Sequence, residues 1–172
     1  MSCVIGLVNK TGVWLGADGI GTTEDGQRRP GILNKIIRNG LYLIGFAGSI
    51  RGGQLTNPYY FKPPRNILDF PNFLIDLFQK SGCLEKTSEG ASIHSCNFII
   101  GYKKKLYEIL ADFQLNEISE YSAIGSGAPF AYGSLYETSS TNLKPEERLI
   151  RALKAAESFD RATGEPFEVH KL

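Results

Sequence analysis

The sequence predicts an α+β fold, with a strand-rich first half and a helical last third. Two observations lead to this prediction. Short apolar runs bounded by turn residues recur over residues 4–46 and again over residues 97–111, as is typical of strands. Residues 145–159 instead place Leu149 and Leu153 on one face of a helix. The order strands, helix, strands, helices favours helices packed on the outer faces of two sheets.

The first hairpin is predicted from two apolar runs, residues 4–8 and 13–17, on either side of the sequence Asn-Lys-Thr-Gly. This four-residue segment has the composition of a hairpin turn. Residues 19–31 follow and are polar, with four glycines and one proline. Because such a composition disfavours both helix and strand, we expect a loop there.

A second hairpin is predicted from residues 35–38 and 41–46, which flank Asn39-Gly40, the strongest short turn signal in the chain. Residues 48–66 come next and are rich in Gly, Pro, Tyr and Asn, with two consecutive prolines. Proline removes a backbone donor and glycine weakens helices. We therefore expect an irregular segment in place of a regular helix.

A helix followed by a third hairpin is predicted in the middle of the chain. Residues 70–80 have apolar side chains at helical spacing, and a glycine at position 82 ends the pattern. Residues 97–102 and 106–111 are apolar runs on either side of three lysines. We interpret the lysines as a solvated turn and not as a binding patch.

Two helices and a strand are predicted near the end of the chain. A helix over residues 128–138 follows a glycine-serine-glycine turn. A second helix over residues 145–159 has Pro145 in its first turn and two glutamates near its positive end. Residues 167–172 can return as a final strand.

Length and composition indicate one soluble cytoplasmic domain over residues 1–172. The net charge of +1 gives no reason to expect a nucleic-acid partner. No apolar run approaches the roughly 20 residues of a membrane span, and the start lacks the pattern of a signal peptide. Cys3, Cys83 and Cys96 are too scattered for a disulfide or zinc framework. We expect no metal, cofactor or membrane partner.

Ser2 is the first candidate catalytic residue. Removal of Met1 would place the Ser2 hydroxyl beside a free α-amine. That amine has a reference pKa of about 7.7–8.0, so near neutral pH it can accept the hydroxyl proton. Serine is also small enough for ordinary methionine excision. Most proteins with serine at position 2 make no use of it, so the rest of the chain must decide.

A series of motifs follows Ser2 in a fixed order. They are Ala17-Asp18-Gly19, Asn34-Lys35-Ile36, Phe46-Ala47-Gly48, Gly125-Ser126-Gly127 and Asp160-Arg161-Ala162-Thr163. Asp18 lies 16 residues after Ser2. Over about residues 2–48 and 96–172 the chain resembles the proteasome β-subunit family, especially its bacterial HslV type. The resemblance implies the four-layer αββα sandwich of N-terminal nucleophile hydrolases.

The resemblance also implies a role for each motif in peptide hydrolysis. Ser2 would attack a peptide carbonyl and form an acyl-enzyme, which water then releases. Lys35 would assist the proton transfer by its positive charge, and Asp18 would hold that lysine in place. The Gly48 N–H would donate to the oxyanion.

Ser126 and Asp160, with Thr163 as a further candidate, would form a polar shell around the terminal amine. Ordinary structural roles remain open for these residues. Asp18 can be a turn residue, Lys35 a solvated side chain, Ser126 a helix N-cap and Asp160 the end of a helix.

The leading interpretation is a self-compartmentalising peptidase of the threonine-protease type, here with serine, that cleaves peptides or unfolded proteins. The resemblance implies homo-oligomeric rings, stacked through the helices at residues 128–138 and 145–159. A separate ATPase is a candidate partner. Two alternatives stay open: a catalytically silent ring or scaffold subunit, and an N-terminal-nucleophile amidase or transpeptidase on small substrates.

Overall fold

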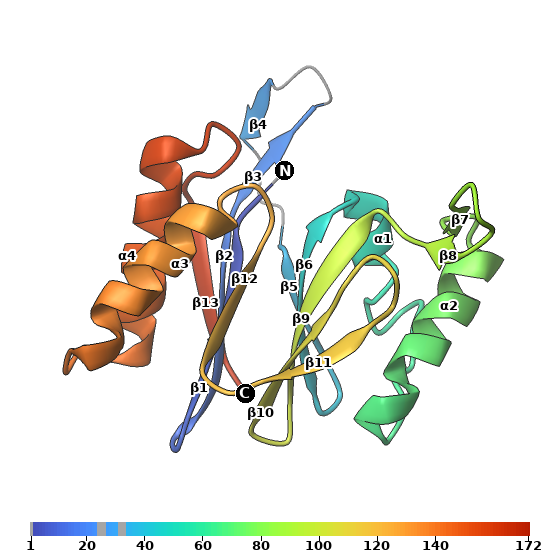
Figure 1. The fold of residues 1–172 in the computed structure, drawn as a ribbon, viewed down its shortest axis with the longest axis horizontal. Coiled ribbons are helices and arrows are strands. Elements are labelled where there is room, and N and C mark those ends of the chain that lie inside the picture. Colours follow the sequence, from blue (N-terminus) through green and yellow to red (C-terminus); the bar gives the residue numbers. More distant parts are fainter. Residues whose placement is uncertain (1, 24–26, 31–33) are drawn as a thin grey trace.

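The structure is a computed structural model that describes residues 2–23, 27–30 and 34–172. Two sheets lie face to face in the middle of the molecule, and helices cover the outer face of each sheet (Figure 1). The layers in order are helix, sheet, sheet, helix. This is the four-layer αββα sandwich that the resemblance to the proteasome β-subunit family implies.

The first sheet contains four antiparallel strands in the order β12-β1-β2-β13. They are β12 (Tyr121–Ile124), β1 (Val4–Asn9), β2 (Gly12–Asp18) and β13 (Phe167–Lys171). Strands β1 and β2 form the predicted first hairpin, with Val8 opposite Val13. All seven residues of β2 are buried, because other layers cover both faces of this central strand.

The second sheet contains five antiparallel strands in the order β11-β10-β9-β6-β5. They are β11 (Leu115–Ile118), β10 (Lys105–Ile109), β9 (Cys96–Tyr102), β6 (Tyr42–Gly48) and β5 (Ile36–Asn39). Strands β5 and β6 form the second predicted hairpin, and Gly40 in their turn has a φ of 60°. Strands β9 and β10 meet at Lys103 and Lys104, which lie in a turn as expected.

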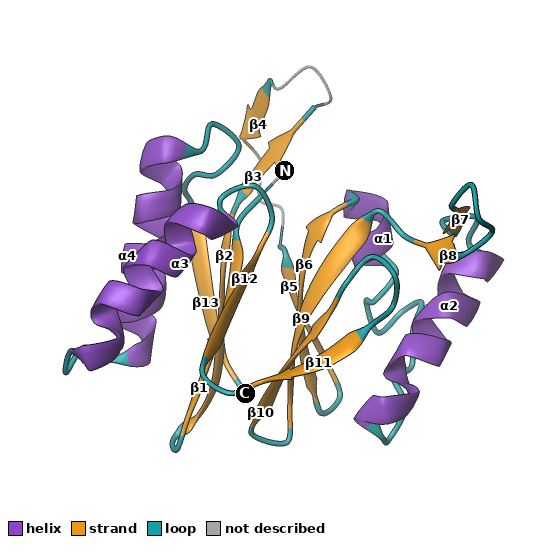
Figure 2. Ribbon diagram, in the orientation of Figure 1, coloured by secondary structure: helices purple, strands orange, loops and turns teal. Residues whose placement is uncertain are grey.

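Helices lie on the outer face of both sheets (Figure 2). They are α3 (Ala128–Glu137) and α4 (Pro145–Phe159) on the four-stranded sheet, and α1 (Ile50–Gln54) and α2 (Phe70–Lys80) on the five-stranded sheet. Leu149 and Leu153 of α4 lie directly on β2, where a Cβ added at Gly16 would come within 3.3 Å of the Leu149 Cβ. Among the described residues, no helix combines the length and apolarity needed to cross a membrane.

Three buried apolar clusters fill the spaces between the layers. Leu15 and Ile99 belong to the cluster between the two sheets. Leu153 belongs to the cluster beneath α3 and α4. The third cluster, beneath α2, is rich in aromatic rings and includes Phe70 and Phe98. The two sheets are therefore held in a fixed relation to each other, which matters because the candidate site is formed by both.

The prediction of a loop over residues 19–31 is wrong where two short strands form. Strands β3 (Ile20–Thr22) and β4 (Arg28–Pro30) pair in an antiparallel hairpin, while residues 24–26 and 31 lie outside the described residues. Ile20 anchors this hairpin, because its side chain is buried and occupies the space beside Gly164, which has no Cβ.

The prediction of a wholly irregular segment over residues 48–66 is wrong at its start, where α1 forms. The Ser49 Oγ caps this helix by accepting the Gly52 N–H at 3.1 Å. Gly53 lies against the Phe46 ring so closely that a Cβ would come within 2.0 Å of it. The glycines that weaken the helical signal are thus the residues that let α1 approach the sheet.

Four small elements complete the chain. They are the strands β7 (Glu85–Lys86) and β8 (Ser92–Ile93), which pair with each other, and two 3₁₀ turns at Ile67–Asp69 and Thr138–Ser140. The first 3₁₀ turn leads directly into α2 and the second extends α3.

Candidate active site

The candidate residues come together at one end of the two sheets. Ser2 lies two residues before the start of β1, Asp18 ends β2, and Gly48 ends β6. Because β1 runs antiparallel to both of its neighbours, its first residues lie beside the ends of β2 and β12. Two backbone hydrogen bonds fix this arrangement: Asp18 N–H donates to Cys3 O at 3.1 Å, and Gly127 N–H donates to Ser2 O at 3.2 Å.

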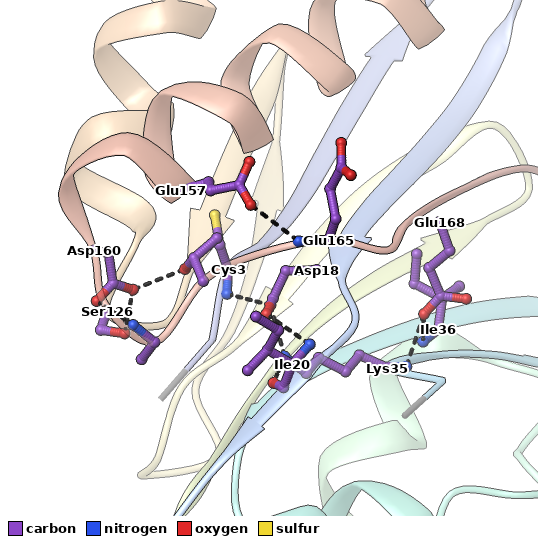
Figure 3. A network of polar contacts seen from close by, with 12 residues as sticks. Cys3, Asp18, Ile20, Lys35, Ile36, Ser126, Glu157, Asp160, Glu165 and Glu168 are labelled. Carbon is purple, nitrogen blue, oxygen red and sulfur yellow. Dashed lines mark hydrogen bonds and ion pairs between the residues drawn. The ribbon is translucent and has the colours of Figure 1, made fainter. Parts of the chain in front are cut away.

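Asp18 and Lys35 form a buried ion pair, with 2.6 Å between Lys35 Nζ and Asp18 Oδ1 (Figure 3). The Lys35 ammonium also donates to Ile20 O at 2.7 Å. Asp18 accepts the backbone N–H of Cys3 through Oδ1 at 2.8 Å and that of Ile20 through Oδ2 at 3.2 Å. The alternative of a solvated Lys35 is therefore wrong, since the residue is 1% exposed.

The buried environment of this ion pair changes the pKa of its lysine. Burial lowers the pKa of the Lys35 ammonium, and the negative charge of Asp18 only partly opposes the shift. A buried ion pair is weak evidence for stability, because desolvation offsets much of the attraction. A buried lysine that has a lowered pKa and a specific carboxylate partner is instead typical of a functional site.

Asp160 organises a second polar group near the start of β1. Its Oδ2 accepts the hydroxyls of Ser126 and Thr163, each at 2.7 Å, and its Oδ1 accepts the Ala162 N–H at 3.1 Å. Burial raises the pKa of Asp160, but these hydrogen bonds outweigh it and hold the pKa below its ordinary value. The N-cap alternative for Ser126 is wrong, because Gly127 occupies that position and Ser126 bonds Asp160.

The glycines that flank Ser126 bring this second group against the N-terminal strand. A Cβ at Gly127 would come within 2.7 Å of Thr163 Oγ1 and 2.8 Å of Cys3 Cβ. Gly125 has a φ of 96°, and a Cβ there would come within 2.1 Å of Ser2 O. Side chains at these positions would push the turn away from Ser2, so the absence of side chains is a geometric requirement of the site.

Gly48 ends β6 of the second sheet and lies at the same candidate site. Its φ is 112°, and a Cβ would lie 2.3 Å from Ser95 O. Only glycine tolerates both conditions. Gly48 is exposed, so an extended substrate can reach its backbone without meeting a side chain.

Cys3 is a second nucleophilic residue beside Ser2, and its environment argues against a thiol mechanism. Its side chain is fully buried. Burial raises the pKa of the Cys3 thiol well above its ordinary value, and the charge of Asp18 adds to this shift. A thiol held in its protonated form is a poor nucleophile. The structure thus favours oxygen over sulfur at this end of β1.

Glu168 on β13 is absent from the predicted site residues, yet it lies directly beside Lys35 (Figure 3). Its Oε1 accepts the backbone N–H of Lys35 at 2.8 Å and that of Ile36 at 3.1 Å. Its Oε2 lies 2.9 Å from His170 Nε2. A glutamate at an alternating position of a strand carries no sequence signal of such a contact, because the contact joins two different sheets.

The described residues contain no group of three or more His, Cys, Asp or Glu side chains placed to hold a metal ion.

Comparisons with known proteins identify the class of fold. The structure of BPH from Thiobacillus denitrificans superposes with a TM-score of 0.86 at 21% identity, covering 99% of this chain and 97% of that one. BPH in complex with epoxomicin gives a TM-score of 0.83 at 20% identity with the same coverage. Eukaryotic HslV from Trypanosoma brucei gives 0.72 at 20% identity, covering 99% and 98%.

These likenesses show that the chain has the HslV-like fold of N-terminal nucleophile hydrolases. They confirm the fold that the sequence motifs predict. No protein-family model matches the sequence, and no curated protein matches it significantly.

Proposed function

We propose that this chain is an N-terminal nucleophile peptidase in which Ser2, after removal of Met1, is the attacking residue. The buried Asp18–Lys35 pair is the observation that carries the proposal, because Asp18 is bonded both to the lysine and to the backbone N–H that follows Ser2. The likeness of the fold to HslV supports it. The complex of BPH with epoxomicin adds a ligand with which to test it.

The proposed mechanism has two stages, formation of an acyl-enzyme on Ser2 and its hydrolysis by water. The α-amine of Ser2 takes the hydroxyl proton while Oγ attacks the carbonyl carbon of a peptide. The Lys35 ammonium stabilises the charge that develops at Oγ, and the Gly48 N–H donates to the oxyanion. The proton then passes from the amine to the leaving nitrogen as the peptide bond breaks. Water finally hydrolyses the ester with the same amine as base.

Asp160 has a positioning role in this scheme. Its carboxylate is held by Ser126 and Thr163 and keeps a lowered pKa. An ionised carboxylate near the start of β1 would orient the terminal amine toward the Ser2 hydroxyl. Without such orientation an amine on a chain terminus samples many rotamers, and proton transfer is slower.

We further propose that copies of the chain close into rings and stack through α3 and α4. Both helices expose aromatic side chains, and Phe130 of α3 stacks on Phe159 of α4 with ring centroids 5.4 Å apart. Tyr132 and Tyr136 are exposed on α3 as well. Enclosure within a ring would shield cellular proteins from a permanently exposed nucleophile. Head-to-tail contacts between identical copies of the chain can close such a ring.

The proposal is tested by comparing hydrolysis of peptides and an unfolded protein by the wild type, Ser2→Ala and Ser2→Thr. Alanine and threonine both permit methionine removal, so the three proteins should share the same mature terminus. We expect Ser2→Ala to lose hydrolysis and Ser2→Thr to keep it. Undiminished hydrolysis in Ser2→Ala would refute the assignment. Retention of Met1 with no hydrolysis would indicate a silent ring subunit instead.

A further inference from the structure

A hollow of about 320 Å³ opens beside Gly48, and apart from Gly48 the residues that line it have no part in the mechanism above. Its lining includes Ala47, Gly48, Asn97, Ala111 and Gly125. These residues come from the end of β6, the start of β9 and the segments that follow β10 and β12. The hollow is called the Asn97 pocket below.

The position of the Asn97 pocket places it next to the reacting bond. Gly48 is the proposed oxyanion donor, and Gly125 lies against the backbone of Ser2. In the second sheet β6 lies between β5 and β9. Lys35 precedes β5, whereas the pocket lies on the β9 side. A peptide bound across Gly48 would therefore have the lysine on one side and the Asn97 pocket on the other.

Asn97 is the side chain that gives this pocket its chemistry. It lies directly opposite Ala47 in the pairing of β9 with β6, and Ala47 belongs to the cluster between the sheets. Opposite residues share a face, so Asn97 points into the same space. Asn97 is half-buried. Within the described part of the chain, its amide makes none of the side-chain hydrogen bonds found.

The lining carries no formal charge among the described residues. It contains no Asp, Glu, Lys or Arg side chain. Burial lowers the pKa of His94, which favours its neutral form, and burial raises the pKa of the Cys96 thiol to about 12. A charged substrate side chain would lose part of its hydration here without gaining a charged partner, which disfavours its binding. An uncharged side chain would bind without this penalty.

We propose that the Asn97 pocket is a substrate subsite that accepts an uncharged side chain next to the scissile bond, with the Asn97 amide hydrogen-bonding a glutamine or asparagine side chain of the substrate. The inference rests on the proposed peptidase function and adds a substrate class to it. A side-chain amide offers both a donor and an acceptor, so two amides can pair in complementary fashion. A leucine would fill the same space but leave the Asn97 amide unpaired.

The test uses two series of peptides, each varying one of the two positions that flank the scissile bond through Gln, Leu, Lys and Glu. In the series whose varied side chain enters the Asn97 pocket, we expect the wild type to give the highest kcat/KM with Gln and the lowest with Lys and Glu. Asn97→Asp should raise the ratio of Lys to Gln about tenfold, and Asn97→Lys should raise the ratio of Glu to Gln similarly. Cleavage sites are identified by mass spectrometry.

Asn116→Asp is the matched control. Asn116 is also half-buried on a strand of the second sheet, but it lies on β11 and is bonded to Gln114. The same charge change there should leave all ratios unaltered. Unchanged ratios in both Asn97 variants, with cleavage still dependent on Ser2, would overturn the subsite and spare the peptidase. Absence of any Ser2-dependent cleavage by the wild type would overturn both.

Discussion

At the scale of single residues, the acidity of Lys35 results from two opposing effects. Burial favours the neutral amine, and Asp18 favours the ammonium. Because the mechanism needs the charged form, kcat/KM should rise with pH as the Ser2 amine loses its proton. It should fall again as Lys35 loses its own. This falling limb belongs below the ordinary lysine range, since burial lowers the pKa of Lys35.

Asp18→Asn tests whether the charge of Asp18 raises the pKa of Lys35. Removal of the carboxylate charge removes the effect that raises the pKa of Lys35. The alkaline limb of the kcat/KM profile should therefore move to lower pH, and the maximum should fall. An alkaline limb that stays in place, or moves to higher pH, would contradict the assignment of that limb to Lys35.

Glu168 is expected to act through the backbone of Lys35 and not on the substrate. Glu168→Ala removes the acceptor for two backbone N–H groups, and the displaced lysine should lower kcat on the order of 10–100-fold with little change in KM. Glu168→Gln keeps an oxygen acceptor and should recover most of the loss. Equal losses in both variants would mean that the charge, and not the hydrogen bonds, is what matters.

At the scale of elements, the sequence predicts best what depends on neighbouring residues. The hairpin at Asn39-Gly40 and the helix α4 have local signals and are found as expected. Strand β3 is missed because a buried Ile20 and contacts with Gly164, distant in sequence, decide it. Strands β11 and β12 are also missed, since each has four residues and little alternation.

The residues of the candidate site likewise differ in whether the sequence alone can identify them. Ser2, Asp18 and Lys35 can be proposed because residue type and order point to them. Glu168 cannot, since only the packing of β13 beside the start of β5 brings its carboxylate to Lys35. Asn97 is likewise invisible in the sequence, because its role depends on which face of β9 meets the other sheet.

The contact of α4 with β2 is expected to contribute strongly to stability. Leu153→Ala would leave a cavity in the fully buried cluster beneath α3 and α4, at a cost of about 2–5 kcal/mol of unfolding free energy. Lys154→Ala is the neighbouring control on the exposed face of the same helix and should change stability by less than about 0.5 kcal/mol. Denaturant unfolding measures both. Equal effects would contradict the packing described for α4.

At the scale of the whole molecule, the ring proposal predicts a large and uniform assembly. Light scattering at micromolar concentration should show a species of about six or more chains. Phe159→Ser removes an exposed aromatic residue of the proposed stacking surface and should lower the mass of the assembly without unfolding the chain. A monomer that still cleaves peptides would contradict enclosure and favour an amidase acting on small substrates.

The proposed mechanism requires that Ser2 becomes the N-terminus and acts as the nucleophile. Intact mass spectrometry before and after treatment with epoxomicin, followed by peptide mapping, tests it most directly. We expect a chain that lacks Met1 and carries one epoxomicin adduct on Ser2, with Ser2→Ala processed in the same way but unlabelled. A wild-type chain that retains Met1, or carries the adduct on another residue, would rule out Ser2 as the N-terminal nucleophile.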